Sequence, residues 1–237
     1  NFPLTLPLEL RKDARKITEI GVGLDGLSIA YSNPPLTVSG GFTRRQATSP
    51  YEDYLYEGHL LIKTDVFQIA VVGSYGTIKV GEEKKPSLFL YGAYAGVVGG
   101  PAAFFVTGLA LGGGYNMRLV LPPVERVAEF PLVTAVTEPA KFDMAKLRDA
   151  IVPSAGDYWL AVVVKFTSFK IADSFALFSV TFGNRLQFAL LGLTKLSLPA
   201  GAAARNCAVY AELQIRAVLD PDAGLFSIEG RLTDNSF

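Results

Sequence analysis

The sequence predicts an all-β protein, either a long curved antiparallel sheet or a sandwich, with a small helical insertion near residues 124–152. Short apolar runs separated by turn sequences recur along most of the chain. Several of these runs alternate apolar and polar residues, which is the period of a strand. The stretch from Pro86 to Met117 carries no charge and eight glycines, and it predicts two apolar strands at the centre of the sheet.

The composition limits the classes of partner. Half of the 237 residues are hydrophobic and 19% are charged, against about 25% charged in an average protein. The 22 basic and 22 acidic residues give a formal net charge of zero, without a basic face. Nucleic acid is therefore not an expected partner, and neither is an anionic membrane surface.

The two apolar arms of the uncharged stretch raise the question of a membrane. Each arm is too short for a spanning helix, and other predicted strands carry Lys63, Lys165, Lys170 and Arg216. We interpret the stretch as buried sheet and do not expect the chain to span a membrane.

The ends of the chain predict a segment of a longer protein. The sequence starts at Asn1 without methionine and ends at Phe237, soon after a predicted strand. A single cysteine, Cys207, excludes an intrachain disulfide. The expected partners are the remainder of a longer parent chain or further copies of this one.

We predict one β-rich domain, 1–237, with a first meander at 17–121. Asp25-Gly26 between Ile17–Leu24 and Leu27–Tyr31 predicts a hairpin. Asn33-Pro34-Pro35 and Gly99-Gly100-Pro101 predict chain reversals. The further predicted strands are Leu36–Thr43, Tyr54–Lys63, Val66–Ser74, Tyr75–Val80, Leu88–Val98, Ala102–Leu111 and Tyr115–Leu121, with a loop at Arg44–Asp53.

A helical insertion at 122–156 and a second meander at 157–237 follow. Pro123 favours a short helix at Val124–Glu129, and Phe142–Val152 has helical spacing, with Asp143 as its cap and Arg148 interrupting the apolar stripe. The predicted strands are Tyr158–Phe166, Phe169–Ile171, Ser174–Phe182, Arg185–Ser197, Ala204–Asp220 and Leu225–Leu232.

Two patterns predict which strand faces are buried. Tyr158–Val164 is apolar on both faces, so it should be central, and an aspartate at Val164 should prevent folding. In Val209–Leu219, apolar residues alternate with Tyr210, Glu212, Gln214 and Arg216, which predicts an apolar face inside and a polar face in water.

The glycines of the central pair suggest a second structural role. We hypothesise that Gly92, Gly96 and Gly108 let the strands curve or let another layer approach the backbone.

Two glycine-rich stretches resemble phosphate-binding loops. Residues 21–26 match G-x-G-x-x-G, but the strand pattern that follows lacks the helix such a loop requires. Gly112-Gly113-Gly114 lacks the lysine of a P-loop and predicts a flexible strand end. Neither predicts a cofactor site.

The remaining polar residues do not form a recognisable active site. His59 is the only histidine and is predicted at the surface, whereas Cys207 is predicted as a core thiol. The acid pairs Glu52-Asp53 and Glu82-Glu83 are predicted in loops. Asp157 beside Trp159 is the one position reminiscent of a glycosidase, which needs two acids. We assign no catalytic, cofactor-binding or metal-binding residue and predict a protein that is not an enzyme.

Several runs resemble a family of unknown function. They are Ile20–Ser28, Asn33–Leu36, Gly99–Leu109, Gly114–Asn116 and Leu121–Leu132, and the most specific is Gly-Pro-x-x-Phe-Phe-Val-Thr-Gly-Leu. The family consists of large β-rich proteins, mainly in very long microbial chains. The resemblance implies a segment of a larger protein and transfers no catalytic residue.

Three functions are compatible with the sequence. The first is a non-enzymatic structural or assembly module that pairs through its sheet edges, within a larger protein or a homo-oligomer. The second is a binding module whose curved sheet forms an apolar groove for lipid-like ligands. The third, which the sequence favours least, is a glycan hydrolase.

Overall fold

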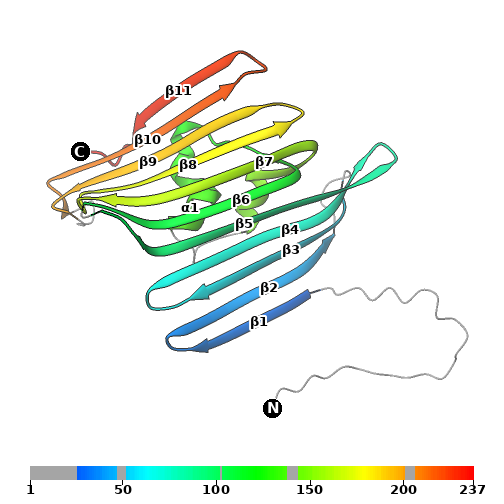
Figure 1. Ribbon diagram of the computed structural model, residues 1–237, viewed down its shortest axis with the longest axis horizontal. Helices are drawn as coiled ribbons and strands as arrows, with labels where there is room; N and C mark the ends of the chain where they lie inside the picture. Colours follow the sequence, from blue (N-terminus) through cyan, green and yellow to red (C-terminus); the bar gives the residue numbers. More distant parts are fainter. Residues whose placement is uncertain (1–25, 47–51, 102, 138–143, 201–205) are drawn as a thin grey trace, which may run out of the picture.

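One antiparallel sheet of eleven strands forms the molecule, and the strands follow one another in chain order from one edge to the other (Figure 1). The computed structural model describes residues 26–46, 52–101, 103–137, 144–200 and 206–237. Within these residues the sheet has no second sheet packed against it, so the single-sheet form of the predicted all-β fold is the correct one.

The strands are long, and each pairs with its neighbours in the sequence. They are β1 (Gly26–Asn33), β2 (Leu36–Gln46), β3 (Glu52–Lys63), β4 (Phe67–Val80), β5 (Glu83–Gly99), β6 (Phe104–Leu119), β7 (Ile151–Ser168), β8 (Ala172–Gly183), β9 (Gln187–Leu198), β10 (Val209–Asp220) and β11 (Leu225–Leu232). The uncharged stretch supplies most of β5 and β6 and lies at the centre of the sheet, as predicted. It is not buried on both faces, because Leu90 and Leu111 are exposed on the face opposite the helices.

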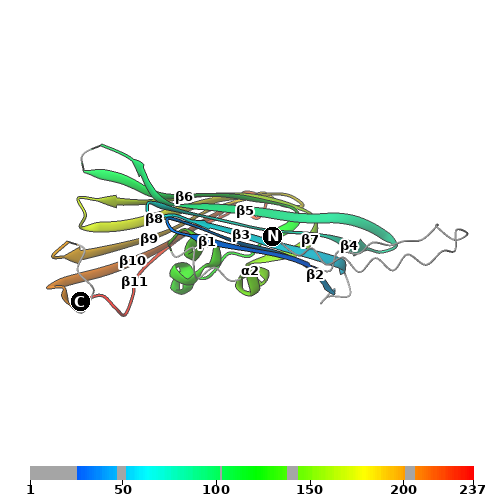
Figure 2. The same ribbon diagram turned by 90° about the horizontal axis from the view of Figure 1, so that it is seen from below.

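Three short helices lie together on one side of the sheet (Figure 2). They are the 3₁₀ helix η1 (Val124–Glu129), α1 (Pro131–Thr137) and α2 (Met144–Ala150). Pro123 precedes η1 and Pro131 begins α1, which are positions where the missing N–H of proline costs little. Leu132, Val136 and Leu147 are fully buried against Trp159 and Val163 of β7.

The first meander differs from the prediction at several boundaries. Residues 64–80 do not contain two strands, because β4 runs from Phe67 to Val80 without a break. The predicted loop at Arg44–Asp53 is wrong at both ends, where β2 continues to Gln46 and β3 begins at Glu52. The predicted Asp25-Gly26 hairpin lies mostly outside the described residues.

Gly112-Gly113-Gly114 is the interior of β6, and the prediction of a flexible strand end is wrong. A Cβ at Gly112 would lie 2.5 Å from the Tyr91 ring, and one at Gly114 would lie 2.2 Å from the Trp159 indole nitrogen. The glycines therefore make room for two large side chains of the neighbouring strands.

The helical layer and the second meander also need correction. Strand β7 begins at Ile151 rather than after residue 156, and α1 was not predicted. Phe169–Ile171 is a turn and not a strand. Phe169 and Lys170 have positive φ angles of 52° and 58°, and the N–H of Ile171 donates to the carbonyl of Ser168.

The irregular start of β7 is held by Asn116, which is buried and has a φ of 51°. Its side-chain Nδ2 donates to the carbonyl of Pro86 at 2.7 Å, and its Oδ1 accepts from the N–H of Gly156 at 2.8 Å. One side chain thus joins β5, β6 and β7 where the ladder between β6 and β7 shifts register.

The helices cover the face of β10 that was predicted to be in water. Glu212 and Gln214 are buried, whereas Leu213 and Leu219 on the opposite face are exposed. The side-chain Oε1 of Gln214 accepts a hydrogen bond from the N–H of Ala128 in η1. The predicted alternation is correct, but the assignment of its faces is wrong.

Strand β7 lies inside the sheet, as predicted, but its two faces differ. Val163 faces the helices and is fully buried, while Val162 faces the other side and is 43% exposed. Val164 shares the face of Val162 and is only partly buried. The expectation that an aspartate at Val164 would be buried is therefore wrong.

Candidate binding surface on the uncovered sheet face

The face of the sheet opposite the helices is built from three complete rows of apolar residues. The strand registers align one residue of each strand in every row, so a row crosses all eleven strands. We call these three rows together the apolar face.

The central row contains Ile29, Gly40, Leu60, Val71, Gly92, Leu111, Val162, Phe178, Leu190, Ala217 and Ile228. One flanking row contains Leu27, Phe42, Gly58, Gly73, Leu90, Gly113, Leu160, Val180, Phe188, Leu219 and Phe226. The other contains Tyr31, Val38, Ile62, Ile69, Tyr94, Leu109, Val164, Ala176, Gly192, Ile215 and Gly230.

None of these positions is charged, and the only side-chain polar atoms are the hydroxyls of Tyr31 and Tyr94. Many of the side chains are open to solvent: Leu111 is 63% exposed and Ile228 is 65% exposed. Single exposed apolar residues are ordinary, but contiguous patches beyond a few hundred Å² mark interaction surfaces. The apolar face is therefore the candidate functional site.

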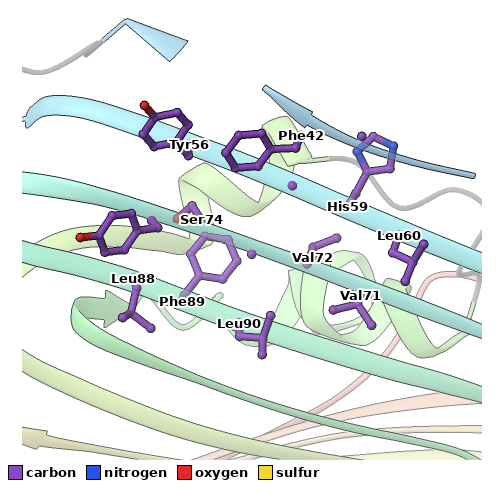
Figure 3. Close-up of a pocket in the computed structure, with 14 residues that line it drawn as sticks. Phe42, Tyr56, His59, Leu60, Val71, Val72, Ser74, Leu88, Phe89 and Leu90 are labelled. Carbon is purple, nitrogen blue, oxygen red and sulfur yellow. The ribbon is translucent and has the colours of Figure 1, made fainter. Parts of the chain in front are cut away.

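A shallow hollow of about 520 Å³ lies in the apolar face over β3 and β4 (Figure 3). Gly58 and Gly73 are paired in register and leave the space that side chains fill elsewhere. Phe42 and Tyr56 stack beside them, with ring centroids 5.1 Å apart. Leu88 and Leu90 of β5 line the opposite side.

Along one margin of the apolar face runs a row of mostly aromatic residues, four of which are tyrosines with polar hydroxyls. It contains Tyr56, Tyr75, Leu88, Tyr115, Tyr158 and Phe182. The rings of Tyr115 and Tyr158 lie 5.0 Å apart, and the guanidinium of Arg44 lies 5.9 Å from the Tyr56 ring. Tyrosine suits such a margin because its ring is apolar and its hydroxyl reaches water.

Charge gathers on the other face. The Glu57 carboxylate accepts hydrogen bonds from Arg148 of α2 at 2.6 Å and from Arg45 of β2 at 3.3 Å. Burial raises the pKa of Glu57, but the two arginines outweigh burial, so the pKa lies below its usual value of 4.5. This cluster joins α2 to the sheet and explains why Arg148 interrupts the apolar stripe.

The polar residues considered in the sequence are dispersed. His59 is exposed on β3, next to Gly41. Cys207 is half-buried before β10 and is not part of the core, contrary to the prediction. Glu52 and Asp53 lie in β3 rather than in a loop, whereas Glu82 is in a turn and Glu83 begins β5.

Asp157 is buried on the helix-covered side of β7 and accepts a hydrogen bond from the Ser154 hydroxyl at 2.7 Å. A carboxylate in this position is structural rather than aimed into an open cleft. Among the described residues, no group of three or more His, Cys, Asp or Glu side chains could hold a metal ion. The helices of the described residues are all too short or too polar to cross a membrane.

The fold and its surface define a class: an all-β protein with a single meandering sheet, one face covered by short helices and the other apolar and uncovered. The chain belongs to a family of unknown function, DUF6603, whose family model matches residues 1–237. This membership confirms the resemblance found in the sequence. No curated protein and no solved structure shows significant similarity to the chain.

The apolar face was not predicted from the sequence as an open surface. The signal was present in the alternation of Tyr56, Gly58, Leu60 and Ile62 in β3, which separates an apolar face from a mixed one. It could have been found by asking, for every strand, whether the apolar face or the mixed face would meet the helices.

Proposed function

We propose that the chain is a structural module, not an enzyme, that assembles by packing its apolar face against the same face of a second copy. The single observation that supports this proposal is the absence of charge from three rows that cross eleven strands.

The chemistry of the apolar face limits its partner. A partner that brought charged groups to the face would bury them without counter-charges, at a cost of several kcal/mol each. A second apolar face carries no such groups. Two copies related by a twofold axis would present identical surfaces to each other, which is the commonest arrangement in homodimers.

The size of the apolar face is sufficient for a stable dimer. Ten strand spacings of about 4.8 Å separate the outer strands by roughly 48 Å, and four residue steps of about 3.4 Å separate the outer rows by roughly 14 Å. The area between them is on the order of 700 Å². Standard protein interfaces bury about 800 Å² on each partner. Two twisted sheets pack face to face about 10 Å apart, with an angle of about 30° between their mean strand directions.

The edges of the sheet offer a second mode of assembly, the one expected from the sequence. Within the described residues, the outer edges of β1 and β11 pair with no other strand. The β11 strand carries only Glu229 and Arg231 as charged residues, so it offers little to discourage pairing. We propose that the same module pairs there with a continuing parent chain or with a further copy.

Sedimentation of the 237-residue chain over a concentration series tests the face-to-face assembly. We expect a dimer that Leu111→Asp converts to a monomer, because an aspartate would be buried unpaired at the centre of the interface. Lys146→Asp, on the exposed surface of α2, should leave the dimer intact. Circular dichroism verifies that both variants are folded.

A cysteine cross-link tests the same assembly without a charge. In a Cys207→Ser background, Leu111→Cys should give a covalent dimer with a short bis-maleimide, and Asp149→Cys on α2 should not. A wild-type chain that stays monomeric at every concentration, with Leu111→Cys uncross-linked, would refute face-to-face assembly. If sedimentation also shows no oligomer of more than two copies, that result would count against edge pairing.

A lipid-like ligand is the second candidate, and the hollow of Figure 3 supports it, because its lining is apolar and open. Organic extraction of the purified protein, followed by mass spectrometry, would then yield lipid in a fixed ratio to protein. Gly58→Leu would fill the hollow, since a Cβ there meets its nearest atom at 3.5 Å. That variant should no longer bind a fluorescent fatty acid probe, while its fold and its state of assembly stay unchanged.

A further inference from the structure

Three arginines line one hollow on the helix-covered side of the sheet. The hollow has a volume of about 310 Å³ and is lined by Arg118, Arg185, Arg216 and Gln187, together with residues 119–121. Arg118 lies near the end of β6, Arg185 lies between β8 and β9, and Arg216 lies in β10. Three separate parts of the chain therefore bring positive charge to the same place.

The charge in this hollow is only partly balanced. Arg216 Nη1 lies 2.7 Å from Glu229 Oε1, and Glu229 is itself 45% exposed. Within the described residues, neither the Arg118 side chain nor the Arg185 side chain has a hydrogen-bond or ion-pair partner. The nearby carboxylate of Asp222 is engaged by the N–H of Leu186 at 2.8 Å.

Two of the donors are buried without an acceptor. The Nε atoms of Arg185 and Arg216 are inaccessible to solvent and have no hydrogen-bond partner. A buried donor that lacks an acceptor costs free energy, which an acceptor would recover once a rotation of the arginine side chain brings the Nε into contact with it. The hollow thus has an excess of donors, an excess of positive charge and space for a small molecule.

We propose that this hollow binds a small oxyanion, namely inorganic phosphate or the phosphate group of a monoester. Guanidinium groups match phosphate because their parallel N–H donors form paired hydrogen bonds with two of its oxygens. The Gln187 amide adds a neutral donor. A cation would be repelled by the three arginines, and an uncharged ligand would leave their charge unbalanced.

This site is independent of the assembly surface. Arg216 pairs in register with Leu191 and Glu229, whose row alternates with those of the apolar face. A dimer formed through the apolar face would leave the hollow open, so phosphate binding and assembly can be measured separately.

Isothermal titration of the 237-residue chain with inorganic phosphate, at constant ionic strength, tests the proposal. We expect saturable binding with one site per chain, and at least about tenfold weaker binding in Arg185→Gln, which removes a charged donor. Arg44→Gln is the control, because Arg44 lies over Tyr56 on the other face and should not alter the affinity. A second titration with glycerol 3-phosphate distinguishes free phosphate from a monoester as the preferred form.

Two outcomes would overturn the proposal. One is the absence of saturable binding of either probe up to on the order of 10 mM, a range that includes weak sites. The other is equal affinity in wild type, Arg185→Gln and Arg118→Gln. Because the Arg118 side chain is exposed, Arg118→Gln keeps the test decisive if Arg185→Gln does not fold.

Discussion

Arg148 of α2 holds Glu57 of β3 through two parallel hydrogen bonds, Nε to Oε1 and Nη2 to Oε2, both 2.6 Å long. The two residues are 91 positions apart in the sequence, and the Glu57 side chain is only 9% exposed. Paired bonds of this kind between guanidinium and carboxylate are among the strongest polar contacts in proteins. Here they fix α2 to the covered face of the sheet.

Removing Arg148 should destabilise the fold. In Arg148→Ala the buried Glu57 carboxylate keeps only the longer contact with Arg45, and we expect a loss of about 2 kcal/mol, reduced from the fully buried case because Arg148 is 38% exposed. Urea unfolding measures the change. A double variant with Glu57→Gln should be less destabilised than Arg148→Ala alone, because no unpaired charge stays buried.

The same pair predicts an acid-sensitive stability. The pKa of Glu57 is lower in the folded state than its usual value of 4.5, so the folded state binds this proton less tightly. The contribution of Glu57 to stability is therefore complete above about pH 4.5 and is lost as the pH falls through the folded-state pKa. Urea midpoints measured below pH 4.5 should fall more steeply in wild type than in Glu57→Gln. Equal slopes would contradict this assignment.

Val163 and Val162 are neighbours in β7 that should respond in opposite ways to the same substitution. Val163→Asp would bury a carboxylate beneath the helices, where Val163 is fully buried, at a cost of several kcal/mol. Val162→Asp should fold, because Val162 is 43% exposed, but should weaken the proposed dimer. Circular dichroism and sedimentation separate the two effects. Similar melting temperatures for the two variants would show that both faces are equally covered.

A valine should destabilise the fold at Gly108 but not at Gly92. A Cβ at Gly108 would lie 2.7 Å from Val136 Cγ1 of α1, so Gly108→Val should displace the helix and cost about 2 kcal/mol. A Cβ at Gly92 would meet only Val71 Cγ2, at 3.9 Å, so Gly92→Val should leave the melting temperature unchanged or raise it. Calorimetry of both variants measures this, and a clear loss in Gly92→Val would reveal a contact at that position.

Tyr91 should make the fold sensitive to alkali. Its hydroxyl donates to the Leu132 carbonyl in α1, and burial raises the pKa of Tyr91 above its usual value of 10.0. Because the folded state holds this proton more tightly, stability should decline as the pH rises above about 10. Tyr91→Phe should make that decline shallower, because burial also raises the pKa of Tyr210, and it should cost about 1 kcal/mol for the lost hydrogen bond. Chemical unfolding between pH 8 and 11 compares the stability of the wild type with that of Tyr91→Phe.

Part of the glycine hypothesis was correct. Gly108 does let another layer approach, because Val136 packs directly over it, whereas a Cβ at Gly92 would meet only Val71 of the same sheet, at 3.9 Å. A Cβ at Gly96 would contact the Tyr94 ring and Phe67, which belong to the same sheet. The sequence cannot separate these cases, since the three glycines stand in similar apolar surroundings.

The sequence by itself determined the fold class, the order of most strands and the turns between them. These features follow from local rules: proline and glycine at turns such as Asn33-Pro34-Pro35, and a period of two in strands such as β3 and β10. It also determined that several strands, including β3 and β10, have one apolar face.

Only the tertiary structure decided which face of the sheet is covered. A period of two assigns Leu213 and Gln214 to opposite faces but does not say which face the helices meet. That choice depends on contacts between distant residues, such as the hydrogen bond from Ala128 to Gln214 and the pair of Arg148 with Glu57. Because polar groups of the helices pair with Glu57 and Gln214, the polar side of these strands is buried and the apolar side is left open.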